Sequence, residues 1–232
     1  MRNRIAVVTG ATGTLGRELV RMLAERGLAV VAVSRSGAPC QAGESAHVAA
    51  DLGSDECVAA IAGALPPGDL AMAVHAIGLP PAPGVTEVDP TLLGVAVNFK
   101  AGGLLRLLRA IDDRIVPGSQ IVAVGGHLGF EPTEHAPLAG VANAALANLV
   151  RQLQGPLGRR GAGVHLSAPA YFESPRTERI IAGKATATGR SADEVRAEIA
   201  AAAPEGRLPT AAEVAGSIVA LLEANGAASI DR

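Results

Sequence analysis

The stretch Ile5-Ala-Val-Val-Thr-Gly-Ala-Thr-Gly-Thr-Leu-Gly16 decides the fold of this 232-residue chain. It begins as the short apolar run of a buried strand and ends where a helical pattern starts. The glycines Gly10, Gly13 and Gly16 between them are spaced as GxxGxxG. Such a turn lets the backbone approach a pyrophosphate group while the helix N-terminus faces its charge. The sequence therefore predicts a dinucleotide site here, and the residues expected to line it are Gly10, Thr12, Gly13, Thr14, Leu15 and Gly16.

Beyond this stretch, short runs rich in Val and Ala alternate with longer helical patterns. The alternation is typical of βαβ units around a buried parallel sheet. We expect strands at residues 4–8, 29–34, 47–50, 70–75, 120–124 and 164–168, with a weak seventh at 227–232. We expect long helices at about 90–112 and 138–154, and capping boxes that start late helices at Ser191 and Thr210. The predicted fold class is α/β, a single-domain, Rossmann-like doubly wound parallel sheet over residues 1–232, in which the segment 171–208 is an insertion that covers the substrate.

Composition and charge exclude several classes of function. A net charge of −2 with no cluster of Lys and Arg argues against nucleic-acid binding. The first apolar run is too short for an export signal or a membrane span, so we expect a cytoplasmic protein. Cys40 and Cys57 lack the spacing of a metal site, and we expect free thiols and no metal.

The residues after the second predicted strand indicate which nucleotide is bound. This segment is Ser34-Arg35-Ser36, and it has no Asp or Glu to accept hydrogen bonds from a ribose. A guanidinium flanked by two hydroxyls suits a 2′-phosphate, so NADP(H) is favoured over NAD(H). The alternative is that Arg35 is an ordinary solvated loop residue.

With these motifs the chain resembles the short-chain dehydrogenase/reductase family over nearly its whole length. The resemblance implies that Asp51 and Leu52 contact the adenine, and that Asn98 is the helix residue that holds a water in the family's proton relay. It also implies that a cofactor would be lined further along by Ala76 and Ile77 of His75-Ala-Ile-Gly78, and by Pro169 near the nicotinamide.

The resemblance breaks down at the reaction centre. The family reduces carbonyls with a Ser, a Tyr and a Lys four residues after the Tyr. The matching positions here hold Gly126, Ala139 and Asn143, and we expect that Gly126 and Ala139 widen the cleft for a bulky substrate. General acid catalysis is worth about 10² to 10⁴ in rate, so ordinary ketone reduction requires a substitute proton donor.

Two residues are the candidates for that substitute. His127 directly follows the vacant Ser position and can act as an acid or base near neutral pH. Tyr171, the only tyrosine, reaches the cleft region from the other side. Alternative interpretations are a backbone-bonded His127 and a Tyr171 that only forms a wall of the pocket. We expect Glu131, Glu134 and His135 to be solvated, His75 to form a hydrogen bond to a ribose or to the backbone, and His165 to be structural.

Three hypotheses follow for the activity. The first is an NADP(H)-binding enzyme that performs non-redox acid/base chemistry, such as cyclisation, dehydration or isomerisation, on a hydrophobic carbonyl compound. The second is an atypical NADPH-dependent reductase with a substitute proton donor. The third is a non-catalytic pseudoenzyme or nucleotide sensor. In each case the resemblance implies a homodimer formed through the two long helices.

Overall fold

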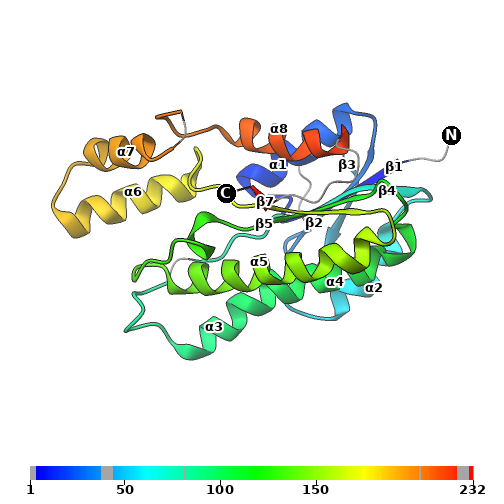
Figure 1. Ribbon diagram of the computed structural model, residues 1–232, viewed down its shortest axis with the longest axis horizontal. Coiled ribbons are helices and arrows are strands. Elements are labelled where there is room, and N and C mark those ends of the chain that lie inside the picture. The colour runs from blue at the N-terminus through cyan, green and yellow to red at the C-terminus, as the bar shows by residue number, and fades with distance from the viewer. Residues whose placement is uncertain (1–3, 38–43, 81, 204, 224–229, 232) are drawn as a thin grey trace.

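Seven parallel strands form the centre of the molecule, with helices on both faces (Figure 1). The computed structural model describes residues 4–37, 44–80, 82–203, 205–223 and 230–231. The strands are β1 (Arg4–Thr9), β2 (Ala29–Ser34), β3 (Glu44–Ala49), β4 (Asp69–His75), β5 (Gln120–Val124), β6 (Gly163–Ser167) and β7 (Ile230–Asp231). Their order across the sheet is β3-β2-β1-β4-β5-β6-β7. This confirms the predicted doubly wound α/β fold.

The strand order reverses between β1 and β4, and this reversal places the site. Val8 of β1 pairs with Ala32 of β2 on one side and with Val74 of β4 on the other. In open parallel sheets, ligands bind outside the carboxyl ends of the strands at such a switch point. The glycine turn after β1 lies at this point.

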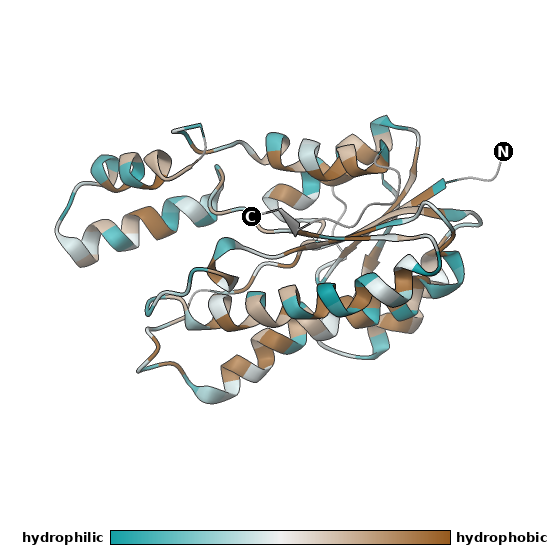
Figure 2. Cartoon of the chain, viewed as in Figure 1, coloured by the Kyte–Doolittle hydropathy of each residue, from teal (hydrophilic) through white to brown (hydrophobic). Residues whose placement is uncertain are grey.

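Helices cover the two faces of the sheet. They are α1 (Thr14–Glu25), α2 (Glu56–Ala64), α3 (Pro90–Val97), α4 (Gly103–Ile111), α5 (Pro137–Gly158), α6 (Pro175–Thr188), α7 (Ala192–Ala201) and α8 (Ala211–Ala220). One core joins α1 and α8 to the sheet, and a second core joins α2, α4 and α5 to the opposite face. Figure 2 shows hydrophobic residues along the strands and in stripes on the covering helices. Each stripe is the buried face of an amphipathic helix.

The helix expected over 90–112 is irregular at its centre. A π-helical turn at Asn98–Gly102 separates α3 from α4, because two small residues let polar groups approach closely here. A Cβ on Gly102 would lie 2.8 Å from Asn98 Oδ1, and a Cβ on Gly103 would lie 2.9 Å from the His75 ring. The long helix predicted at about 90–112 is confirmed as a continuous helical stretch, Pro90–Arg114, and its centre is a π-turn of the kind that is frequent at functional sites.

By length and composition alone, the stretch Pro90–Arg114 qualifies as a membrane span, with a mean hydropathy of 1.3. Leu104, Leu107 and Ile111 of α4, however, are buried on the sheet. The α4 part of this stretch therefore packs on the sheet as a core helix.

Other boundaries differ modestly from prediction. β3 begins at Glu44 instead of residue 47, because this edge strand alternates exposed and buried residues and offers only a short apolar signal. α5 continues to Gly158, past Pro156. Both predicted capping boxes are confirmed, at Ser191 with Glu194 and at Thr210 with Glu213.

The segment 171–208 contains α6 and α7, which pack on each other through a small core of their own, formed by Ile181, Val195, Ile199 and Leu208. In Figure 1 these two helices extend from the sheet as an arm at the left of the view.

Cys57 is a buried free thiol, whereas Cys40 lies outside the described residues.

Candidate functional site

The glycine turn is built for close backbone approach. Gly10 has a φ of +71°, and a Cβ on it would lie 2.4 Å from the carbonyl oxygen of Ala76. A Cβ on Gly16 would lie 2.2 Å from the carbonyl oxygen of Gly10. Neither position can hold a larger side chain without moving backbone. Gly13 and Thr14 are exposed at the start of α1, so the N-terminus of this helix is open to an anion.

The turn and the end of β2 lie side by side. The Ala11 N–H donates to the carbonyl oxygen of Val33 at 3.1 Å, which brings the segment Ser34-Arg35-Ser36 next to the glycines. Ser34 is buried, whereas Arg35 is exposed. A second exposed guanidinium, that of Arg17, donates to the carbonyl oxygen of Thr12 in the same turn at 3.0 Å. Two cations thus lie on the side of the turn where a ribose 2′-phosphate is expected.

Asp51 and Leu52, the two residues predicted to contact the adenine, lie in a turn that is hydrogen-bonded to Arg106 of α4. Asp51 Oδ1 accepts the Gly53 N–H at 2.9 Å, and Leu52 is buried. The Arg106 guanidinium donates to the Leu52 carbonyl oxygen at 3.0 Å and to Asp55 Oδ1 at 2.6 Å. One arginine of α4 therefore sets the position of the whole turn.

Asn98 takes part in the same set of hydrogen bonds. Its Nδ2 donates to the Gly53 carbonyl oxygen at 2.9 Å, and its Oδ1 accepts from Arg106 at 2.9 Å. The Asn98 amide is therefore engaged on the adenine side. The side chain of Asn98 thus positions the turn, and the role in a proton relay that the resemblance implied for Asn98 stays a prediction.

His75 is structural, and it bonds to the backbone as expected. It is fully buried at the end of β4, where Nδ1 lies 2.9 Å from Thr9 Oγ1 and Nε2 lies 3.2 Å from the Phe99 carbonyl oxygen. Burial, with a smaller effect of Lys100, lowers the pKa of His75 to about 3. The ring is therefore neutral and ties β1 and β4 to the π-turn. His165 is likewise buried, with Nε2 2.7 Å from Gln120 Oε1.

The vacated reaction centre is more tightly filled than the sequence suggests. A Cβ on Gly126, just after β5, would lie 2.9 Å from Asn143 Nδ2 of α5. The Asn143 amide therefore occupies the space beside Gly126. This corrects the expectation that Gly126 widens the cleft. Asn143 is 7% exposed, and its Oδ1 is buried without a hydrogen-bond partner. Such an orphaned acceptor usually marks the place of a water or a ligand donor.

Lys100 is a buried cation beside this centre. It is 5% exposed, and its Nζ donates to the Val124 carbonyl oxygen at the end of β5, at 2.8 Å. Burial, followed by the charge of Arg176, lowers the pKa of Lys100 to about 7. No carboxylate contributes to this shift. The Lys100 ammonium group thus contacts Val124, the residue two positions before Gly126.

His127 and Tyr171 meet on the other side of the cleft. Their ring centroids are 5.1 Å apart in an edge-to-face arrangement. The backbone N–H of His127 donates to the Pro169 carbonyl oxygen at 3.4 Å. Burial lowers the pKa of His127 and raises the pKa of Tyr171. The two catalytic candidates are therefore neighbours, and both are half-buried.

Arg176 lies at the start of α6, within reach of the same region. A Cβ on Gly78 would lie 3.5 Å from its Nη1. The residue as a whole is exposed, while burial of its guanidinium end lowers its pKa. Within the part of the chain that the structure describes, Arg176 has no ion-pair partner. Its charge is available to an anionic ligand.

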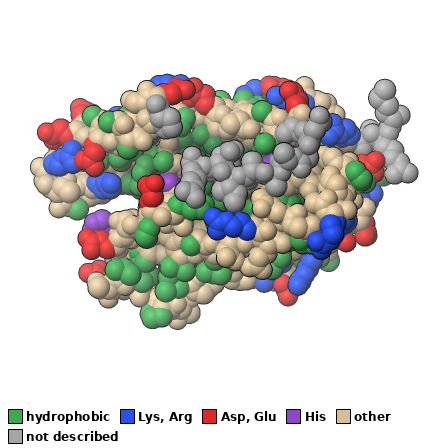
Figure 3. Space-filling model, viewed as in Figure 1, with side chains coloured by type: hydrophobic (Ala, Val, Ile, Leu, Met, Phe, Trp, Pro, Cys, Tyr) green, Lys and Arg blue, Asp and Glu red, His purple; other side chains and the backbone are tan. Residues whose placement is uncertain are grey.

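Figure 3 shows the molecule hollowed between the arm of α6 and α7 and the layer of α3 and α5, with charged and histidine side chains at the mouth of the notch. Glu134 and His135 form a loose pair in which both side chains are 74% exposed, and Glu131 is also exposed, in agreement with the solvated positions expected for them.

These features and the comparisons with known proteins agree: the chain belongs to the short-chain dehydrogenase/reductase family. A family model described as enoyl-(acyl carrier protein) reductase matches residues 10–229.

Among its curated relatives, cis-4-hydroxycyclohexanecarboxylate dehydrogenase of Sinomonas cyclohexanicum is 33% identical, over 94% of this chain and 88% of the relative. The short-chain reductase protein NovJ of Streptomyces niveus is 26% identical, over 93% of this chain and 85% of NovJ.

Among solved structures, a variant of actinorhodin polyketide ketoreductase with NADPH matches with a TM-score of 0.85 and 24% identity, covering 98% of this chain and 95% of the other. L-sorbose reductase of Gluconobacter frateurii, complexed with NADPH and L-sorbose, matches with a TM-score of 0.81 and 18% identity, covering 99% and 95%.

Sequence reasoning missed Lys100, Arg106 and Arg176. A lysine or arginine in a helix is usually solvated, and nothing in the local pattern marks these three. One compositional signal was available for Lys100. Lysine stands at only two of the chain's 20 Lys and Arg positions, 100 and 184, so a lysine that is retained among arginines stands out.

Proposed function

We propose that this chain is an NADP(H)-dependent oxidoreductase that interconverts a small carbonyl compound and its alcohol. The observation that carries the proposal is the glycine turn, where Gly10 and Gly16 leave room only for backbone, set at the switch point of a parallel sheet. The ionisable side chains of this site are those of Lys100, His127, Tyr171 and Arg176. The named activities of the curated relatives, a dehydrogenase and a reductase, support hydride transfer over non-redox chemistry.

The residues along this edge fit a nicotinamide dinucleotide, which supplies or accepts a hydride when bound. The turn and the start of α1 would hold the pyrophosphate. Arg35, with Arg17 close by, would hold the 2′-phosphate, and Asp51 and Leu52 would lie against the adenine. At the other end, the unpartnered Asn143 Oδ1 would accept a hydrogen bond from the nicotinamide ribose.

Two features of the cleft indicate the substrate. His127 and Tyr171 form an edge-to-face pair that would contact the substrate oxygen and ring. The guanidinium of Arg176 suits a carboxylate, because Arg pairs with carboxylates in two parallel hydrogen bonds. We therefore propose a small, partly hydrophobic carbonyl or hydroxy compound that carries a carboxylate. A relative whose name specifies a hydroxycyclohexanecarboxylate is in line with this proposal.

Nucleotide titration tests the cofactor. NADPH should bind more tightly than NADH in a fluorescence titration, and Arg35→Ser should weaken NADPH about tenfold or more by removing a charged hydrogen bond. NADH binding should change little in the same variant. The exposed Arg26→Ser, at the far end of α1, is the matched control. Equal affinity for both nucleotides in the wild type would contradict the NADP(H) assignment.

Turnover separates the three hypotheses for activity. With NADPH and 4-oxocyclohexanecarboxylate supplied anaerobically, a reductase consumes the nicotinamide absorbance together with the ketone. The alternative of non-redox cyclisation, dehydration or isomerisation predicts that carbonyl compounds are converted with no change in that absorbance. A nucleotide sensor predicts binding without either change.

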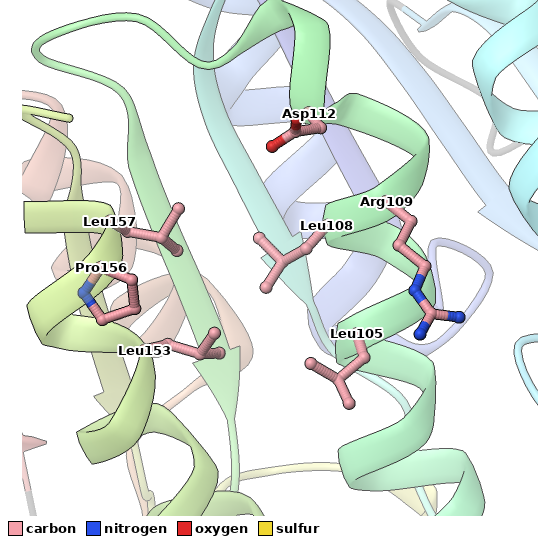
Figure 4. A pocket seen from close by; sticks show the side chains of 7 residues that line it. All are labelled: Leu105, Leu108, Arg109, Asp112, Leu153, Pro156 and Leu157. Carbon is pink, nitrogen blue, oxygen red and sulfur yellow. The ribbon is translucent and has the colours of Figure 1, made fainter.

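We further propose that the protein acts in the cytoplasm as a homodimer. A groove of about 390 Å³ runs between α4 and α5, lined by Leu105, Leu108, Arg109, Asp112, Leu153, Pro156 and Leu157 (Figure 4). Leu105 in this groove is 38% exposed. An apolar groove between the two helices that the family resemblance implicates supports a contact between copies.

A further inference from the structure

The position of Lys100 matters because of what surrounds it. Its carrier, the π-turn Asn98–Gly102, packs against α5, and its Nζ reaches the end of β5 at Val124. An ammonium group has three donors, and Val124 takes one of them. Asn143, across on α5, presents a buried acceptor with no donor. The Nζ of Lys100 therefore lies at the end of β5, two positions before Gly126, which stands at the family's Ser position, and it has donors beyond the one that Val124 accepts.

The choice of lysine is itself informative. The chain uses arginine at 18 of its basic positions and lysine only at 100 and 184. Arginine stays protonated at any accessible pH, whereas lysine releases its proton when it is buried. A buried arginine could hold a charge at this position but could not exchange a proton.

The charged groups that face Lys100 all favour that exchange. His75 of β4 is close enough that Lys100 lowers its pKa, and it stays neutral. Arg176 of α6 is a second cation across the cleft, and its charge together with burial brings the pKa of Lys100 to about 7. Asn143 of α5 is polar and uncharged. Among the described residues, no carboxylate contributes to the pKa of Lys100.

We propose that Lys100 is the proton-carrying catalytic residue of this site, standing in from the π-turn for the ammonium group that α5 lacks at Asn143. The inference rests on the proposed oxidoreductase function. In a reduction, a bound NADPH would supply the hydride, and the carbonyl oxygen must then gain one proton. One Nζ–H bond of Lys100 breaks as that O–H bond forms, which leaves a neutral amine that regains a proton from water. During alcohol oxidation the neutral amine accepts the hydroxyl proton.

Nuclear magnetic resonance of wild-type protein with isotope-labelled lysine tests this placement without turnover. Only two lysine side-chain signals are expected, and Lys184→Arg assigns them. The Lys100 signal should titrate near pH 7, and saturating NADPH should shift both the signal and its titration midpoint. Failure of NADPH to bind, seen by fluorescence, would overturn the proposed function and this inference together. NADPH binding that leaves the Lys100 signal and its midpoint unmoved would overturn this inference alone.

Variants test the catalytic step. With 4-oxocyclohexanecarboxylate and NADPH, kcat/KM of the wild type should fall as pH rises through about 7, because the reduction needs the ammonium form. Lys100→Met keeps the length of the side chain, and it should lower kcat about 100-fold or more and remove this inflection. Lys184→Met, on the exposed face of α6, should change neither. A folded Lys100→Met variant that retains the wild-type pH profile would overturn the proposal. If that variant does not fold, the wild-type resonance experiment decides.

Discussion

At the scale of single residues, His75 makes stability depend on pH. Its folded pKa of about 3 lies below that of an unfolded histidine, so the unfolded chain binds an extra proton between these values. The free energy of unfolding should therefore be unaffected by His75 above about pH 6.5 and should fall by about 1.4 kcal/mol per pH unit below it. Denaturant unfolding from pH 8 to 4 measures this slope.

Two variants isolate the contribution of His75. His75→Gln keeps a polar group between Thr9 and Phe99 but does not titrate, so it should lose that part of the acid destabilisation. His135→Gln, at a side chain that is 74% exposed, should retain it. Parallel pH slopes for the wild type and His75→Gln would show that the ring is not held neutral.

Arg176 provides a second prediction at this scale. Arg176→Gln should raise the KM for 4-oxocyclohexanecarboxylate by about 10- to 100-fold, since a hydrogen bond to a charged group contributes about 1.5–3 kcal/mol. Cyclohexanone, which has the same ring without the carboxylate, should lose little. If the variant instead weakens NADPH binding and changes the KM for both ketones to the same extent, Arg176 binds the cofactor phosphates and not the substrate.

At the scale of elements, the turn at 51–55 and the π-turn are held in register by one side chain. Arg106 bonds Leu52, Asp55 and Asn98 at once through its forked guanidinium. Arg106→Lys keeps the charge but cannot make all three bonds. We expect a loss of about 1–3 kcal/mol in unfolding free energy and a weaker affinity for NADPH, because the part-buried acceptors of Leu52 and Asn98 lose their donor. The exposed Arg26→Lys is the control. Unchanged NADPH affinity in Arg106→Lys would separate this turn from the cofactor site.

The elements also show where sequence reasoning succeeds and where it stops. The strands β2 and β5 match their predicted bounds, because strands buried on both faces are continuous apolar runs with abrupt ends. The glycine turn was readable because its GxxGxxG spacing directly follows an apolar strand, although the contact that requires glycine at position 10 is made with Ala76, far away in sequence.

The π-turn was not readable, because it depends on contacts with His75, which lies 28 positions before Gly103. Lys100 was missed for the same reason: its environment is set by β5, α5 and α6, and no local pattern reports on their meeting point. The vacant catalytic positions could be located in the sequence, but the filling of the space beside Gly126 by Asn143 became visible only once α5 was placed.

At the scale of the whole molecule, the groove between α4 and α5 predicts self-association (Figure 4). Light scattering coupled to size exclusion should give twice the chain mass of 23.2 kDa for the wild type. Leu105→Glu should give the single-chain mass, because an unpaired carboxylate in an apolar interface costs several kcal/mol. In the monomer this glutamate is four residues before Arg109 on the exposed face of α4, a spacing that stabilises the helix and preserves the fold. Val85→Glu, at a site that is 56% exposed before α3, should remain dimeric. A wild-type protein that stays at the mass of one chain at tens of micromolar, or a Leu105→Glu variant that stays dimeric, would place the contact elsewhere or remove it.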